Sequence, residues 1–106
     1  MKTITLAEDL LEHLDFIQGR DIQEKLSRLV ENNLLLQIKE CEELIFKFES
    51  KYGMDFENFA ALWEADGIKN RHSHEVERDY MEWEGFAQER TKLLNALRSL
   101  KIKKEK

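Results

Sequence analysis

The chain opens with "KTITL" (residues 2–6), in which polar and apolar side chains alternate. Thr3 and Thr5 fall on one side of an extended segment, and Ile4 and Leu6 fall on the other. This period of two predicts a β-strand. No second strand is predicted elsewhere, so we expect a second copy of the chain to pair with it across a two-fold axis.

Helical spacing begins directly after this segment. Residues 7–17, "AEDLLEHLDFI", have apolar side chains three and four apart and predict a helix that ends at Gly19. A second helix begins after Asp21, with Glu24 placed three positions on as in a capping box. Its later apolar residues step by four and three, as in a coiled-coil seam: Leu34, Ile38, Cys41, Ile45, Phe48 and Tyr52. We expect one helix of about 30 residues with two packing roles.

The second half of the chain predicts two further helices. Gly53 ends the long helix, and Asp55 caps a short one, "FENFAALWEA". The polar segment 66–73, "DGIKNRHS", is the clearest linker, and the last helix runs from about residue 74 to residue 100 or beyond. We therefore expect three regions: an N-terminal module (1–33), the continuing long helix (34–53) and a helical partner-binding region (54–106).

Composition favours a small helical protein. The chain has 106 residues with no proline, four glycines and 37% charged residues. A chain of this size drawn into long helices buries little core, so oligomerisation is expected. No apolar run has the length of a membrane span and no signal-peptide core is present, so we expect a cytoplasmic protein without a membrane role. The single cysteine fits a reducing compartment.

Three stretches near the N-terminus, "TITLAEDLLEHL", "QGRD" and "IQEKLSRLVEN", give a strand, a short acidic helix, a glycine turn and a second helix. In this order they resemble the ribbon-helix-helix fold of small prokaryotic repressors and antitoxins, over residues 2–32. Further along, "FKFESKYGMDFENF" and "ERDYMEWEGF" are similar to the C-terminal part of small antitoxin-like proteins, within residues 46–100.

These resemblances imply a mainly α fold with an N-terminal ribbon-helix-helix module, a long second helix and a helical extension. They imply the antitoxin of a type II toxin-antitoxin system: a homodimer that represses its own operon at operator DNA and neutralises a toxin. The alternative function is a dimeric coiled-coil interaction protein without DNA binding.

The same resemblance implies which residues contact DNA. In that fold the paired ribbon enters the major groove and the start of the second helix binds phosphate. The corresponding residues here are Lys2, Thr3, Thr5, Arg20, Lys25 and Arg28. Segment 1–32 nevertheless holds four basic and seven acidic residues, so counterion release would supply little affinity. DNA binding would then depend on a partner that adds positive charge, or the module would serve only as a dimerisation clasp.

Aromatic side chains are the most informative feature of the second half. The candidates for partner binding are Phe56, Phe59, Trp63, Tyr80, Trp83 and Phe86. Trp and Tyr dominate protein-interaction hot spots, which favours an anchor set for a partner. The alternative is that the short helix folds onto the last helix and these aromatics form the core between them.

Catalytic and metal-binding patterns are missing from the sequence. The chain has no glycine-rich phosphate loop, no nucleophile with a nearby base and no Glu-x-x-His pair. His72 and His74 lie in a polar linker without further converging ligands. We therefore expect neither an enzyme nor a cofactor or metal site.

Overall fold

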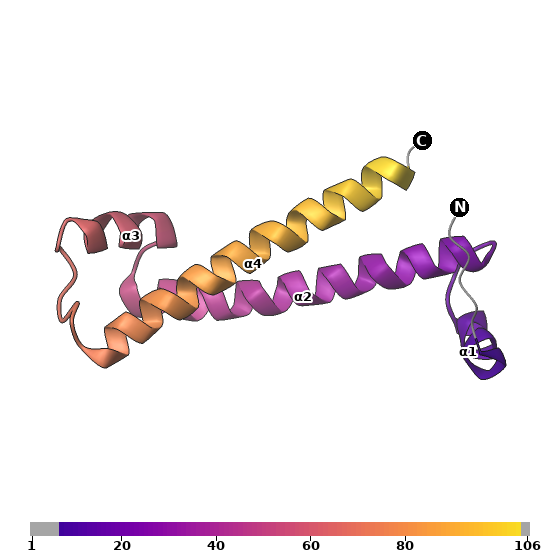
Figure 1. Ribbon diagram of the computed structural model, residues 1–106, viewed down its shortest axis with the longest axis horizontal. Helices are drawn as coiled ribbons and strands as arrows, with labels where there is room; N and C mark the ends of the chain where they lie inside the picture. Colours follow the sequence, from indigo (N-terminus) through magenta and orange to yellow (C-terminus); the bar gives the residue numbers. More distant parts are fainter. Residues whose placement is uncertain (1–6, 105–106) are drawn as a thin grey trace.

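Two antiparallel helices of equal length form most of the protein. The computed structural model describes residues 7–104, and within this range all regular elements are helical. They are α1 (Glu8–His13), a short 3₁₀ turn (Leu14–Phe16), α2 (Ile22–Tyr52), α3 (Phe56–Glu64) and α4 (His74–Lys104). Helices α2 and α4 pack together, α3 lies at the end where the chain turns back, and α1 lies at the opposite end (Figure 1).

The helix boundaries follow from local capping. Asp21 accepts a hydrogen bond from the backbone N–H of Glu24 at 2.8 Å and starts α2. Gly53 ends α2 in a left-handed conformation with φ 69°, which glycine adopts without a side-chain clash. Asp55 then accepts from the N–H of Asn58 at 2.9 Å and starts α3. The predicted caps at these three positions are confirmed.

The coiled-coil seam is filled within one chain. Ile38 and Cys41 of α2 are buried against Leu93 of α4. The half-buried side chains Leu34, Leu94 and Leu97 complete this cluster. Ion pairs flank the seam on the surface, between Arg90 and Glu42 at 3.0 Å and between Lys101 and Glu31 at 3.9 Å. The apolar positions that predicted a dimer seam are therefore covered by α4 of the same molecule.

The predicted ribbon-helix-helix fold is wrong. The expected strand, residues 2–6, lies outside the described residues, and the described part contains no strand. Helix α2 runs without a break through residue 33, the expected end of the N-terminal module. The physical reason is that α4 covers Leu34, Ile38 and Cys41 of α2 within the same chain, so the hairpin forms without a paired ribbon. The architecture is an all-α hairpin.

The hairpin is elongated. Its principal extents are 56 × 30 × 23 Å and its radius of gyration is 19.7 Å. A compact domain of this length has a radius of gyration of about 13 Å. The surface area is 8521 Å², whereas a compact monomer of this mass exposes about 6,200 Å². The molecule thus exposes roughly 2,300 Å² beyond what its size requires.

Candidate protein-interaction surfaces

The aromatic residues predicted to bind a partner converge at the closed end of the hairpin. Five of them, with Phe48 and Tyr52 of α2, form a cluster that we name the aromatic head. Its members from the predicted set are Phe56, Phe59, Trp63, Tyr80 and Trp83. Ring centroids lie 4.5 Å apart for Trp63–Tyr80 and 4.9 Å apart for Phe59–Trp83. The sixth residue, Phe86, stacks on Phe48 at 6.4 Å beside the head.

Burial shows what the aromatic head does in this conformation. Phe59 and Trp83 have no exposed surface, so neither side chain is available to a partner. Their packing holds α3 against α2 and α4, as the core interpretation of these aromatics expected. The linker is tied to the same cluster, because Arg71 pairs with Asp66 at 3.2 Å and stacks over the ring of Trp63 at 5.0 Å.

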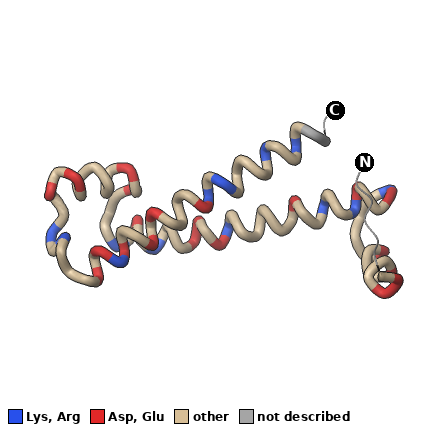
Figure 2. The backbone as a smooth tube through the Cα atoms, viewed as in Figure 1, with Lys and Arg blue, Asp and Glu red and all other residues tan. Residues whose placement is uncertain are grey.

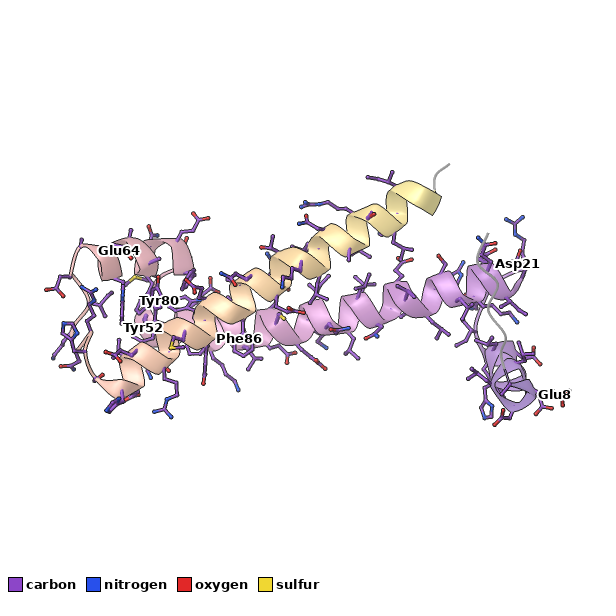
Figure 3. The ribbon with its side chains drawn as sticks, in the orientation of Figure 1. Glu8, Asp21, Tyr52, Glu64, Tyr80 and Phe86 are labelled. Carbon is purple, nitrogen blue, oxygen red and sulfur yellow. The ribbon has the colours of Figure 1, made fainter. Side chains whose placement is uncertain are left out.

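A polar clamp closes the hairpin beside the aromatic head. Lys51 of α2 donates to Asp79 at 2.6 Å and to Glu75 at 2.7 Å, and the Tyr52 hydroxyl also donates to Asp79 at 2.5 Å. Figure 3 labels Tyr52 and Tyr80, which belong to the same cluster, at this end of the hairpin. Burial, reinforced by the hydrogen bond to Asp79, raises the pKa of Tyr52 to about 12.

The clamp also shifts the pKa values of its carboxyl and amine groups. Burial of Asp79 opposes its charged form, but the hydrogen bonds from Lys51 and Tyr52 outweigh burial and hold the pKa of Asp79 below its usual range. The hydrogen bonds that Lys51 donates to Asp79 and Glu75 raise the pKa of Lys51. All of these shifts favour the ionised Lys51–Asp79 pair at neutral pH.

A second apolar stripe runs along the first half of α2, on the side facing away from α4. We name it the outer stripe: Ile22, Leu26, Leu29, Asn33 and Leu36. These positions step by four and three, as in a coiled-coil seam. The exposed fractions are 48% for Ile22, 37% for Leu29 and 56% for Leu36. The polar Asn33 interrupts this stripe, so hydropathy along the sequence does not connect Leu36 with the earlier members.

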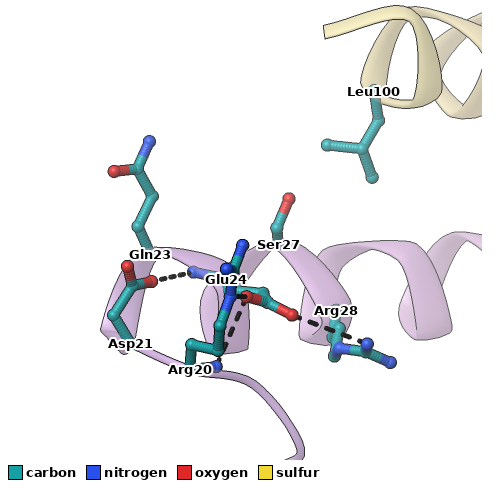
Figure 4. A pocket seen from close by; sticks show the side chains of 7 residues that line it. All are labelled: Arg20, Asp21, Gln23, Glu24, Ser27, Arg28 and Leu100. Carbon is teal, nitrogen blue, oxygen red and sulfur yellow. Dashed lines mark hydrogen bonds and ion pairs between the residues drawn. The ribbon is translucent and has the colours of Figure 1, made fainter. Parts of the chain in front are cut away.

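The predicted DNA contacts do not form a basic surface. Lys2, Thr3 and Thr5 lie outside the described residues. Figure 4 shows Arg20 and Arg28 turned toward Glu24, with contacts of 3.3 and 3.6 Å. Lys25 lies 3.8 Å from Asp15.

Hydrogen bonds from the Arg20 backbone and side chain lower the pKa of Glu24, so this carboxylate stays charged beside the arginines. The open hollow next to it, about 640 Å³, is lined by Arg20, Asp21, Gln23, Glu24, Ser27, Arg28 and Leu100. Two basic and two acidic side chains line it, so it has no excess of positive charge.

A more acidic hollow lies where α2, the start of α3 and α4 meet. We name it the acidic groove, and its volume is about 710 Å³. Its lining residues are Glu42, Ile45, Phe46, Glu49, Asp55, Phe56, Glu57, Ala87, Arg90 and Thr91. Phe46 is 65% exposed, which is unusual for a phenylalanine. This groove could not be predicted from the sequence, because its residues come from three separate elements.

Other site types find no support in the described residues. No group of three or more His, Cys, Asp or Glu side chains there is arranged to hold a metal ion. Cys41 is buried in the seam, and burial raises the pKa of its thiol. None of the helices in the described range is long and apolar enough to span a bilayer.

Comparison with known proteins adds no identity. No family model, curated protein or solved structure matches this chain.

Proposed function

We propose that this protein is a non-catalytic interaction protein that binds and masks a partner protein along the outer stripe of α2. The similarity of residues 46–100 to antitoxin-like proteins suggests the class of partner, a toxin encoded beside it. The proposed occupant of the stripe is a helix of that toxin, because spacing of four and three matches the contact line between two packed helices.

The observation that carries the proposal is exposed apolar surface on a regular helix face. Ile22, Leu29 and Leu36 lie seven residues apart, so their half-exposed side chains form one line along α2. A standard interface removes about 800 Å² from each partner. The roughly 2,300 Å² of surplus surface on this chain is ample for such an interface.

Operator binding is not part of the proposal. The ribbon-helix-helix fold that implied it is absent from the described residues, and the arginines and lysine at the start of α2 lie beside carboxylates. What remains of the antitoxin interpretation is the masking of a toxin. The proposal combines this role with the alternative function from the sequence analysis, an interaction protein without DNA binding.

Co-expression with the product of the adjacent gene tests the proposal. We expect the two proteins to co-purify and the present chain to relieve growth arrest caused by its partner. The variant Leu29→Lys/Leu36→Lys should weaken binding tenfold to hundredfold, since losing two half-exposed leucines from an interface costs about 1.5–3 kcal/mol.

A matched control comes from the next residue along. Leu35 is 46% exposed but lies on a different face of α2, so Leu35→Lys should leave binding and growth unchanged. The proposal fails if the adjacent gene product does not bind, or if Leu35→Lys and the stripe variant weaken binding equally.

A further inference from the structure

Two surfaces of opposite charge lie beside different parts of α4: the acidic groove and a basic stretch nearer the C-terminus. The acidic groove contacts α4 at Ala87, Arg90 and Thr91. Beyond it, residues 92–104 hold five Lys or Arg and no Asp or Glu. Figure 2 shows basic residues recurring toward the C-terminal end of this helix, away from the groove. We name Arg98, Lys101 and Ile102 the basic end.

The groove keeps most of its negative charge. Arg90 is its single basic residue and pairs with Glu42 at 3.0 Å. Within the described residues no ion pair is found for Glu49, Asp55 or Glu57. Beside these carboxylates, Phe46 presents an exposed ring to solvent. A segment that fits this groove is therefore basic and carries an apolar side chain.

The basic end has those properties. Ile102 is 59% exposed, and Arg98 is exposed one turn before it. Arg98 and Ile102 follow the groove residue Thr91 by seven and eleven residues, so all three lie on one face of α4. The rise of an α-helix puts them about 10 and 16 Å from Thr91 along the axis. Since α4 is a continuous helix, its end does not fold back into its own groove.

We propose that two copies of the chain associate antiparallel, each seating the basic end of α4 in the acidic groove of the other. Groove and basic end lie on the same face of one helix, so a single two-fold axis near Asn95 forms both contacts at once. Arg98 then faces Glu49, Asp55 and Glu57, and Ile102 packs on Phe46. Lys101, which lies 3.9 Å from Glu31 of its own chain, exchanges that exposed pair for the groove carboxylates of the other copy. This surface is separate from the outer stripe.

Sedimentation equilibrium of the full chain tests this arrangement. We expect a dimer whose Kd rises with salt, because exposed charges are screened. Arg98→Glu/Lys101→Glu reverses the basic end, and Glu49→Lys/Glu57→Lys reverses the groove. Each variant replaces attraction with repulsion at both contacts and should weaken the dimer by at least about tenfold.

Mixing the two reversed variants supplies the decisive result. In a 1:1 mixture each groove again faces an end of opposite charge, so a heterodimer should form from two proteins that are monomeric alone. The controls Lys92→Glu and Glu43→Lys change exposed charges on other faces of α4 and α2 and should leave the dimer intact. Circular dichroism confirms that each variant keeps its helices.

Three outcomes would overturn the proposal. The first is a monomer at all concentrations in low salt, and the second is a dimer that neither reversal weakens. The third is a mixture of the reversed variants that stays monomeric although both are folded. A dimer broken by Leu29→Lys/Leu36→Lys and insensitive to the charge reversals would place self-association on the outer stripe instead. Loss of toxin binding alone would leave this proposal standing.

Discussion

Phe59 is the side chain on which the attachment of α3 depends most, and Phe59→Ala tests that dependence. The ring is fully buried and lies 4.6 Å from Tyr52, 4.9 Å from Trp83 and 5.9 Å from Tyr80, between ring centroids. It therefore joins all three helices of the aromatic head. Removing it leaves a cavity bounded by rings that are themselves fixed by the helices.

The magnitude follows from the buried area. A buried aromatic side chain removes about 150–250 Å² from water, worth about 4–6 kcal/mol at 25 cal/mol per Å². Measured Phe→Ala changes in cores cost about 3–5 kcal/mol. A domain of this length has a total stability of roughly 5–15 kcal/mol. We expect Phe59→Ala to lose about 3–5 kcal/mol and to release α3, while α2 and α4 stay helical.

Urea unfolding followed by tryptophan fluorescence and by circular dichroism measures both effects. Fluorescence reports the aromatic head, since Trp63 and Trp83 are the only tryptophans and both belong to it. Phe16→Ala is the control, because this ring is 86% exposed and its loss should cost under about 1 kcal/mol. A cost for Phe59→Ala no larger than that of the control would refute the packing argument.

Three further predictions concern the hairpin. Gly85→Ala should stabilise the protein by about 0.5–1 kcal/mol, because Gly85 lies inside α4 with open space where a Cβ would stand. Gly53→Ala should destabilise the protein, because the φ of Gly53 is 69°. The melting temperature should rise for the first variant and fall for the second. Leu93→Ala should cost about 2–5 kcal/mol in urea unfolding, against little change for the half-exposed Leu35→Ala, because Leu93 is buried in the seam. The folded-state pKa of Asp79 is lowered, so this carboxylate stabilises the fold fully above its unfolded pKa near 4, and the stabilisation is lost as pH falls through the folded pKa. The free energy of unfolding should therefore decline in acid. Asp79→Asn should be less stable at pH 7 but show a shallower decline below about pH 4. An unchanged acid profile in Asp79→Asn would contradict this assignment.

The sequence predicts the helices better than their partners. Asp21, Gly53 and Asp55 act through neighbours within three or four residues, so their capping roles are visible in the sequence. The spacing from Leu34 to Tyr52 likewise predicts a packed seam. It does not say whether a second chain or α4 covers that seam, because both supply the same apolar face. That ambiguity kept the dimeric coiled coil as an alternative, whereas the wrong fold prediction came from the resemblance of residues 2–32 to the ribbon-helix-helix fold.

The first helix and the interaction surfaces show two other limits of prediction from the sequence. Residues 7–17 predict one helix ending at Gly19, but α1 ends at His13 and a 3₁₀ turn follows, with extended backbone at Ile17. The acidic groove depends on residues from three elements, so only their three-dimensional arrangement brings Glu49 near Glu57. By contrast, the aromatic residues could be predicted to form a core, since their spacing places them on facing sides of two amphipathic helices.

The most direct test of the account is the distance between α2 and α4 within one molecule. Spin labels at Glu43→Cys and Lys92→Cys, in a Cys41→Ser background and diluted with unlabelled protein, report that distance by pulsed electron paramagnetic resonance. The antiparallel hairpin predicts one narrow distribution near roughly 20 Å, the 8–10 Å between packed helix axes plus the two label arms. A broad distribution, or a short distance that disappears on dilution with unlabelled chain, would contradict the hairpin.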